Sequence, residues 1–416
     1  MTLIDIGFGD LFGMAIEAQI QLPEKWVNPE ILNWARTRMA LRPEQVESLA
    51  GVSTERIIEW ERAKSAPSLS DLQSLAEIYD CPVGYFFLDS PPEEKQPLDF
   101  RGLIAEKIGV LSYETHIHLN EFLNLTNYLT SLIEDLKLPH EVNIDTVNID
   151  EPVELVARRE RERFGFTPEI RERWITANEA FDFWREAIES RGVFVITLKL
   201  KASEVRGASR WDSPHIPAIL VNRIDMEAST GRTFTLLHEW AHLLTKHSGL
   251  VCDFRGQAKA ANIERFANQF AAEILVPKKE FEIYLKQIGL FTRRSRWADL
   301  TIDKIRNDFK VSRDVIAILL EEMKFAPSGF YRDKRASWDL RKPFFKVLPG
   351  ARGRGRTKAV RRLLEIGRPT ANLMAIAYEK GAISKLDLAE VLNMKVEQAE
   401  RFVSWVRENP KGHEGI

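Results

Sequence analysis

The sequence predicts a mixed, mainly α-helical protein with a small α/β core in its middle. Its 416 residues exceed what one ordinary hydrophobic core accommodates, so two to four domains are expected. Several segments repeat apolar residues every three or four positions, as amphipathic helices do. Two runs rich in β-branched residues, Gly192–Leu198 and Pro217–Asn222, read as strands. We therefore expect a helical N-terminal domain, a central core with a short sheet and a C-terminal helical module.

Residues 28–90 predict four or five short helices, and Ser53 offers an N-cap for one of them. The turn Leu49–Ser53, together with Trp60–Arg62 and Pro67–Ser68, resembles the Xre/Cro-type helix-turn-helix. Such a domain reads DNA with the helix that follows Ser53. The side chains that this resemblance implies for the groove are Thr54, Glu55, Arg56 and Glu59.

The charge of this first domain is unfavourable for DNA. Residues 28–90 contain six Lys or Arg and ten Asp or Glu, a net charge of −4. Non-specific affinity for DNA comes almost entirely from basic side chains that neutralise phosphates. DNA binding therefore stays open beside a role in partner docking or in forming a homodimer.

A connector is expected between the first domain and the core. Pro91–Pro97 has the composition of a linker, helical periodicity covers about 102–137, and residues 138–152 mark the entry to the next domain. The expected organisation is an N-terminal segment 1–27, the helix-turn-helix 28–90, a connector 91–150, the core domain 151–323 and a C-terminal region 324–416.

The segment His238–His242, with the sequence HEWAH, carries the clearest chemical signal. On a helix its two histidines share one face and can bind one zinc ion. Glu239 lies beside them, placed to take a proton from water. Because the helix is apolar nearly all round from Phe234 to Leu244, two imidazoles and a carboxylate inside it are costly unless a metal ion satisfies them. This is the zincin arrangement, which indicates metal-assisted hydrolysis, usually of a peptide bond.

A catalytic zinc needs a third protein ligand and an open position. His247 fits the metzincin spacing poorly and suits a cation at the end of the helix. Glu264 falls inside the apolar arc of a second predicted helix, where an acid needs a partner. Asn268, one turn later, is placed to orient that carboxylate. The alternative is that Glu264 forms a surface salt bridge near a helix start.

Phe234–His242 and Glu264–Ala271 together resemble the ImmA/IrrE family of zinc metallopeptidases, over about residues 150–320. The resemblance implies that His238, His242 and Glu264 are zinc ligands and that Glu239 is the general base. Phe266 departs from the family, since many relatives carry a second Glu there, but it is not an implied ligand. A compact α/β zincin core is also implied, with a short sheet upstream of the metal helix. An exposed edge of that sheet could hold an extended substrate by strand addition.

The C-terminal region begins with closing helices over Ile302–Met323 and then becomes basic. Residues 324–371 contain 14 Lys or Arg and three acids, and Gly350–Lys358 is expected to be a flexible basic loop. That loop is either a solvated surface or an electrostatic contact with nucleic acid or an acidic partner. Beyond it, 383–392 and 396–406 predict another helix-turn-helix pattern, which could be a second DNA contact or a clamp on a partner.

Composition narrows the class of protein. The apolar content of 44% with 29% charged residues is typical of a soluble globular protein, and no apolar run approaches a membrane span. Met1–Ile20 has acids and no basic residue, unlike a secretory signal. Two cysteines, Cys81 and Cys252, favour a reducing cytoplasm. The formal net charge of −2 indicates nothing about partners.

Two functions follow from these patterns. The first is a cytoplasmic zinc endopeptidase that regulates by cleaving a specific protein, for which the family resemblance implies a helix-turn-helix repressor. The second is a non-proteolytic transcription regulator or antitoxin-like protein that uses the fold as a scaffold and neutralises a toxin-like partner. Both predict zinc, so only a change such as Glu239→Gln separates them.

Overall fold

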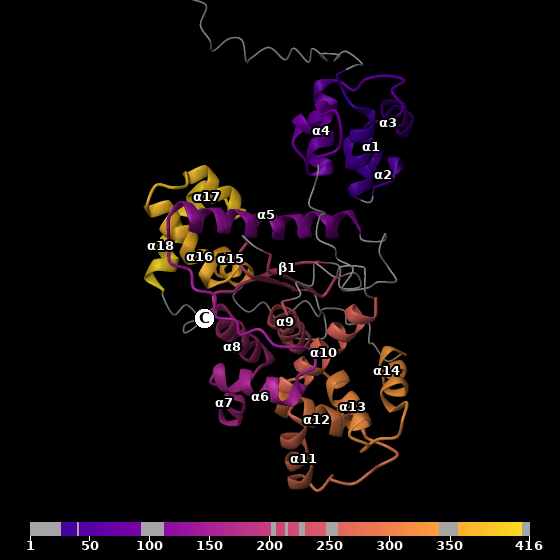
Figure 1. Cartoon of the computed structure of the whole chain (residues 1–416), viewed down its shortest axis with the longest axis vertical. Helices are drawn as coiled ribbons and strands as arrows, with labels where there is room; N and C mark the ends of the chain where they lie inside the picture. The colour runs from indigo at the N-terminus through magenta and orange to yellow at the C-terminus, as the bar shows by residue number, and fades with distance from the viewer. Residues whose placement is uncertain are drawn as a thin grey trace, which may run out of the picture. The chain divides into compact units, whose positions relative to one another are not determined.

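A computed structural model describes residues 26–39, 41–92, 112–200, 205–212, 215–223, 229–246, 257–340 and 357–409 (Figure 1). These residues are mainly helical and contain a three-stranded sheet, which confirms the predicted fold class. The chain divides into two compact units, Met1–Pro97 with Gly109–Ile117, and Leu98–Ile108 with His118–Ile416. Within the described ranges, no helix combines the length and the apolar character that a membrane crossing requires.

The first unit is a bundle of short helices. They are α1 (Pro29–Arg38), α2 (Pro43–Ala50), α3 (Thr54–Glu61), α4 (Leu69–Tyr79) and the 3-10 helix η1 (Val83–Phe87). Gly51 ends α2 in the left-handed conformation (φ 70°), and the Ser53 hydroxyl caps α3 by accepting from the N–H of Arg56, as predicted. Arg36 joins α1 to α3 through two hydrogen bonds to the carboxylate of Glu61, at 2.6 and 2.8 Å. The helices enclose a core that includes Trp60, Tyr79 and Phe86.

The second unit contains the sheet. Its preceding helices are α5 (Tyr113–Asp135), whose first turn belongs to the first unit, α6 (Val153–Arg163), α7 (Pro168–Arg173) and α8 (Ala177–Glu189). The strands β1 (Phe194–Leu198), β2 (Gly207–Arg210) and β3 (Ala218–Asn222) lie in the order β1-β3-β2. β1 pairs with β3 in parallel and β2 pairs with β3 antiparallel, so β2 is an edge strand.

The helices α9 (Ser229–Leu244) and α10 (Gln257–Leu275) form the centre of this unit. α9 packs against β2, β3, α8 and α10, and Figure 1 shows it between the sheet and α10. Its tryptophan, Trp240, is buried and donates a hydrogen bond from its indole nitrogen to Glu160 of α6, at 3.1 Å. Because Glu160 is also buried, this bond satisfies both groups and fixes α9 against α6.

Four further helices follow α10: α11 (Lys278–Gln287), α12 (Asp299–Phe309), α13 (Arg313–Glu322) and α14 (Phe330–Leu340). Asp303 of α12 accepts hydrogen bonds from Arg306 at 2.7 Å and from Arg313 of α13 at 2.6 Å. These bonds hold α12 and α13 together beside α14.

A C-terminal module packs on β1 through its first helix. It consists of α15 (Lys358–Ile366), α16 (Arg368–Glu379), α17 (Lys385–Val391) and α18 (Val396–Glu408). The buried guanidinium of Arg185 in α8 donates to the carbonyl of Leu364 at 2.5 Å and to that of Val195 at 2.6 Å. Gly367, between α15 and α16, packs closely against the end of α8: an added Cβ would lie 2.5 Å from the Glu189 carboxylate. The predicted helix-turn-helix pattern corresponds to α17 and α18, whereas residues 350–356 of the predicted loop lie outside the described residues.

Candidate metal centre

Three predicted ligand side chains converge from α9 and α10. His238 and His242 lie one turn apart on α9, and their Nε2 atoms are 3.1 Å apart. Glu264 lies on α10, with one carboxylate oxygen 3.3 Å from Nε2 of His238 and the other 3.2 Å from Nε2 of His242. Among the described residues these three side chains form a His-His-Glu group able to hold a metal ion.

The spacing of these atoms fits a zinc ion. Zinc–nitrogen and zinc–oxygen bonds of about 2.0–2.1 Å in a tetrahedral site place the ligand atoms about 3.3 Å apart. The observed separations of 3.1, 3.2 and 3.3 Å lie close to that value. The two Nε2 atoms, each also facing an oxygen of Glu264, are arranged around one common point. A cation satisfies both nitrogens and the carboxylate at once.

The electrostatics of the group favour a charged carboxylate. Burial of Glu264 opposes its ionisation, but hydrogen bonds from His238 and His242 outweigh that effect and lower its pKa to about 2. Burial likewise works against a charge on His238, and its contacts with Glu264 and Glu239 overcome this and raise its pKa. The Glu264 side chain is 30% exposed, compared with 12% for His238 and 3% for His242, so the group opens toward solvent at Glu264.

Glu239 lies next to this group on α9 and is only 2% exposed. Its Oε2 is buried and has no hydrogen-bond partner among the described residues. The backbone of Gly207 in β2 lies directly against it: an added Cβ would be 3.1 Å from Cγ of Glu239 and 2.4 Å from Cγ2 of Thr235. The edge strand therefore approaches the metal helix closely only because residue 207 has no side chain. A carboxylate oxygen without a partner is available to accept a proton.

Asn268 also contacts the His-His-Glu group, but it bonds to a different member of the group from the one expected. The sequence places it where it could orient Glu264, whereas the structure gives its side chain a hydrogen bond with His238. Nδ1 of His242 is buried without a hydrogen-bond partner among the described residues. His247, the alternative ligand, lies outside those residues.

A cavity of about 880 Å³ lies beside α9 and α10; the three ligand side chains do not line it, but Asn268, which hydrogen-bonds His238, does. Phe234, Thr235 and Asn268 line it from α9 and α10, and Arg206 lines it immediately before β2. The opposite wall comes from α13 and α14 and includes Val315, Ile318, Tyr331 and Arg335. A cavity of this size, with mixed apolar and polar walls, is typical of a ligand or substrate site.

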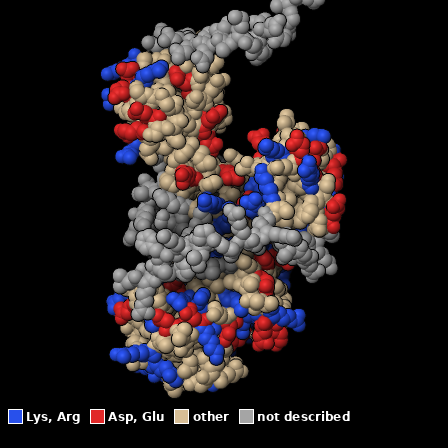
Figure 2. All heavy atoms as spheres, turned by 180° about the vertical axis from the view of Figure 1, so that it is seen from behind, with Lys and Arg blue, Asp and Glu red and all other residues tan. Residues whose placement is uncertain are grey.

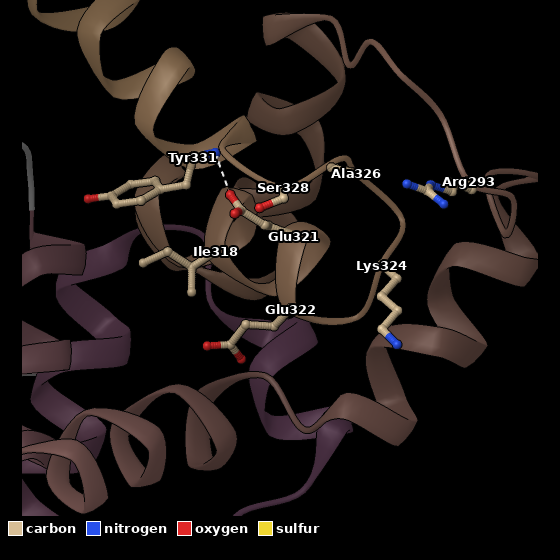
Figure 3. A pocket seen from close by; sticks show the side chains of 8 residues that line it. All are labelled: Arg293, Ile318, Glu321, Glu322, Lys324, Ala326, Ser328 and Tyr331. Atoms are coloured by element: carbon tan, nitrogen blue, oxygen red, sulfur yellow. Dashed lines mark hydrogen bonds between the residues drawn. The ribbon is translucent and has the colours of Figure 1, made fainter.

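A second cavity of about 610 Å³ shares Ile318, Glu322 and Tyr331 with the first (Figure 3). Glu321 accepts hydrogen bonds from the N–H groups of Gly329 and Tyr331, both at 2.7 Å. Figure 3 shows the Tyr331 ring extending away from the Glu321 carboxylate. These two bonds hold the backbone at Gly329 and Tyr331 against α13, and so position Tyr331 in the wall that the two cavities share. None of these wall residues carries a local sequence signal, so they were not predicted as site residues.

The four predicted DNA-contacting residues all lie at the start or middle of α3. Glu55, Arg56 and Glu59 are exposed. Thr54 donates to the carboxylate of Glu47 at 2.5 Å, and Glu59 accepts from Ser65 at 3.2 Å. The guanidinium of Arg56 lies over the Trp60 ring and 3.6 Å from Asp71. The exposed face of α3 therefore presents two carboxylates and one cation.

Comparison with known protein families assigns two regions of the chain. Residues 188–321, which contain the sheet, α9 and α10, match the IrrE N-terminal-like domain, which is classed among the peptidases. The chain carries an IrrE-like domain. Residues 32–86 match a helix-turn-helix domain, so the suspected architecture of an IrrE-like domain behind an N-terminal helix-turn-helix is confirmed.

Comparison with individual proteins adds less. No curated protein matches this chain. A solved Mycobacterium tuberculosis transcriptional regulator is similar at 15% identity and a TM-score of 0.29, over 46% of this chain and 50% of that one. The match thus spans half the length of that regulator. The His-His-Glu group lies inside the residues of the IrrE-like domain.

Proposed function

We propose that this chain is a zinc-dependent endopeptidase that acts as a regulator by cleaving a specific protein, such as a helix-turn-helix repressor. The observation that carries the proposal is the convergence of His238, His242 and Glu264 beside the buried carboxylate of Glu239. The peptidase class of the matched domain supports it. The substrate class rests on the resemblance to the ImmA/IrrE family.

His238, His242 and Glu264 would hold the metal. Zinc, when bound, supplies Lewis-acid chemistry that acidifies water and polarises a carbonyl. Glu239 acts as general base: it takes the proton from the attacking water and then gives it to the leaving amine. The backbone of Gly207 packs against Cγ of Glu239, and this close contact restricts where the carboxylate can lie.

The substrate would lie in the cavity of about 880 Å³ next to these residues. Among the described residues β2 is an edge strand of the sheet, and at its start Gly207 lies against Glu239 and Arg206 lines the cavity. An extended peptide that adds to this edge gains backbone hydrogen bonds, while the cavity takes one of its side chains. This arrangement suits an extended segment of a protein better than a compact folded surface.

The N-terminal helix-turn-helix domain supplies the regulatory part of the proposal, through DNA or a partner protein. Its carboxylates Glu55 and Glu59 on α3 repel phosphates, so we expect a weaker hold on DNA than a basic helix would give.

Glu239→Gln tests the proposal. The amide keeps the shape of the side chain but cannot accept the proton, so cleavage of a candidate repressor should fall by at least about 100-fold. Zinc content, measured by elemental analysis, should stay at one per chain because Glu239 is not a ligand. Glu282→Gln on α11, outside the site, is the matched control and should cleave as the wild type does.

The scaffold alternative makes the opposite prediction. A non-proteolytic regulator or antitoxin-like protein would keep its transcriptional phenotype in Glu239→Gln. If the zinc-loaded wild type leaves every candidate repressor intact while Glu239→Gln retains full regulation, the peptidase proposal is wrong.

A further inference from the structure

The C-terminal module contains a turn between two helices that parallels the one in the matched helix-turn-helix domain. In α2–α3 the turn has a left-handed residue, Gly51 (φ 70°), and a buried one, Val52. In α17–α18 it has a left-handed residue, Asn393 (φ 48°), and a buried one, Leu392. Both turns span three to four residues, the length that is typical of a helix-turn-helix. No family comparison assigns this region, because the matches end at residue 321.

The second helix of this pair presents a polar face to solvent. Lys395 precedes α18, and together with Gln398 and Arg401 it forms an exposed row spaced three residues apart. The opposite face carries Ala399 and Phe402, which are buried in the module. Residues three apart are neighbours on a helix surface, so the row is continuous. Arginine and glutamine are the side chains that read guanine and adenine edges in the major groove.

A further cation flanks this row. The ammonium group of Lys358, at the start of α15, donates to the side-chain oxygen of Gln398 at 3.1 Å. The carboxylate of Glu400 is engaged by Lys385 at 2.6 Å and by the hydroxyl of Tyr378 at 2.8 Å. Glu397 is the exposed acid beside the row. Together with Lys395 just before α18 and Lys358 beside it, Arg401 makes three exposed basic groups around the row, against the exposed acid Glu397 and the ion-paired Glu400.

The charge of the module is more favourable to DNA than that of the N-terminal domain. Residues 357–409 contain nine Lys or Arg and seven Asp or Glu, a net charge of +2, against −4 for residues 28–90. The sixteen residues that precede it, 341–356, add six basic side chains and no acid to the sequence. Figure 2 shows Lys and Arg gathered on one side of this module and acidic side chains along another margin. Counterion release by basic side chains supplies most of the affinity for DNA.

We propose that α16–α18 form a second DNA-binding helix-turn-helix, in which α18 enters the major groove of duplex DNA. Gln398 and Arg401 read base edges, and Lys395 and Lys358 contact the phosphates that flank them. This site is independent of zinc and of peptidase activity, and it provides the basic surface that α3 lacks.

The test uses the full-length protein and a fluorescein-labelled pool of 30-bp duplexes with a randomised centre. The pool is enriched on the wild type, and binding is then followed by anisotropy between 50 and 300 mM salt. Lys395→Gln should weaken binding to all sequences and reduce the slope of log K against log salt by about one. Arg401→Gln should weaken binding to the enriched sequence by roughly 5- to 150-fold and relax its preference at one position.

Lys380→Gln is the matched control, since it removes one exposed positive charge at the end of α16, outside the row. It should bind as the wild type does, and so should Glu239→Gln. Equal melting temperatures of all variants show that the module is folded; Gln398→Ala replaces any variant that melts earlier. The proposal is overturned if the wild type binds no duplex at 50 mM salt, or if Lys395→Gln and Arg401→Gln bind like Lys380→Gln. Loss of binding only in Arg56→Gln of α3 also overturns it.

Discussion

At the residue scale, the chemistry depends on how closely Gly207 approaches Glu239. An added Cβ at residue 207 would lie 2.4 Å from Cγ2 of Thr235, closer than real contacts come, and 3.0 Å from the carbonyl oxygen of Leu220, which is a tight contact. Either the side chain of Thr235 or the backbone of β2 has to shift to admit it. Because the same Cβ would lie only 3.1 Å from Cγ of Glu239, one turn after Thr235, we expect the shift to displace the side chain of the proposed general base.

Gly207→Ala is therefore expected to reduce cleavage at least tenfold while the zinc content stays unchanged, since no ligand is touched. Forcing one methyl group into this contact should also lower the free energy of unfolding by about 1–3 kcal/mol. Chemical denaturation and elemental analysis measure the two quantities. Gly84→Ala is the control: nothing lies within 4 Å of an added Cβ there, so a change below about 1 kcal/mol is expected. Equal effects of both changes would contradict this account.

The sequence predicted the residues whose signal is local. His238 and His242 are neighbours by helical spacing, and the apolar arc around Glu264 directed that acid toward the core. The close approach of Gly207 could not be predicted, because it depends on how a strand thirty residues earlier packs on α9. The sequence also could not decide whether Asn268 bonds to Glu264 or to His238, because that choice depends on how α9 and α10 pack.

At the element scale, strand prediction followed composition. β1 and β3 are rich in β-branched residues and were predicted, whereas β2 reads Gly-Ala-Ser-Arg and was missed. Tertiary contacts hold β2 instead: its Arg210 is buried and donates to Asn127 of α5 at 2.6 Å and to Asp212 at 2.6 Å. The cavity wall formed by α13 and α14 likewise depends on long-range packing.

The ion pairs of Asp303 in α12, one of them with Arg313 of α13, make the stability of the packing between these two helices depend on pH. Hydrogen bonds from Arg313 and Arg306 outweigh burial and hold the pKa of Asp303 below its ordinary value. A lowered folded-state pKa means that the stabilisation is present above the ordinary pKa, near 4, and is lost as the pH falls through the folded value. Asp303→Asn should therefore lower the free energy of unfolding by about 1–2 kcal/mol at pH 7 and by less at pH 3.

Urea denaturation of the wild type and of Asp303→Asn at pH 7, 5 and 3 measures this difference. Asp333→Asn is the control, because its side chain is 71% exposed and pairs with its sequence neighbour Arg332 at the surface. It should change stability by less than about 0.5 kcal/mol at every pH. A difference for Asp303→Asn that is as large at pH 3 as at pH 7 would show that the ionised carboxylate is not its source.

At the scale of the whole molecule, the chain consists of two compact units with separate cores. The His-His-Glu group belongs to the second unit alone. A ligand stabilises only the unit that binds it, by about 2.7 kcal/mol when its concentration is a hundred times its Kd. We expect calorimetry to resolve two transitions, of which zinc raises one.

Removal of the metal by EDTA should lower the Tm of that transition and leave the other unchanged. His238→Ala is the control, because a chain without this ligand should show no response to EDTA in either transition. Equal shifts in both transitions would mean that the metal is not confined to the second unit.

The central claim is that Glu264 joins His238 and His242 on one metal ion, and zinc content tests it most directly. Elemental analysis of the purified wild type and of Glu264→Gln, after dialysis against a weak chelator, gives the number of zinc ions per chain. We predict one zinc per wild-type chain, a large loss in Glu264→Gln, and full retention in the control Glu282→Gln. Full zinc in Glu264→Gln, or none in the wild type after zinc is supplied, would contradict the account.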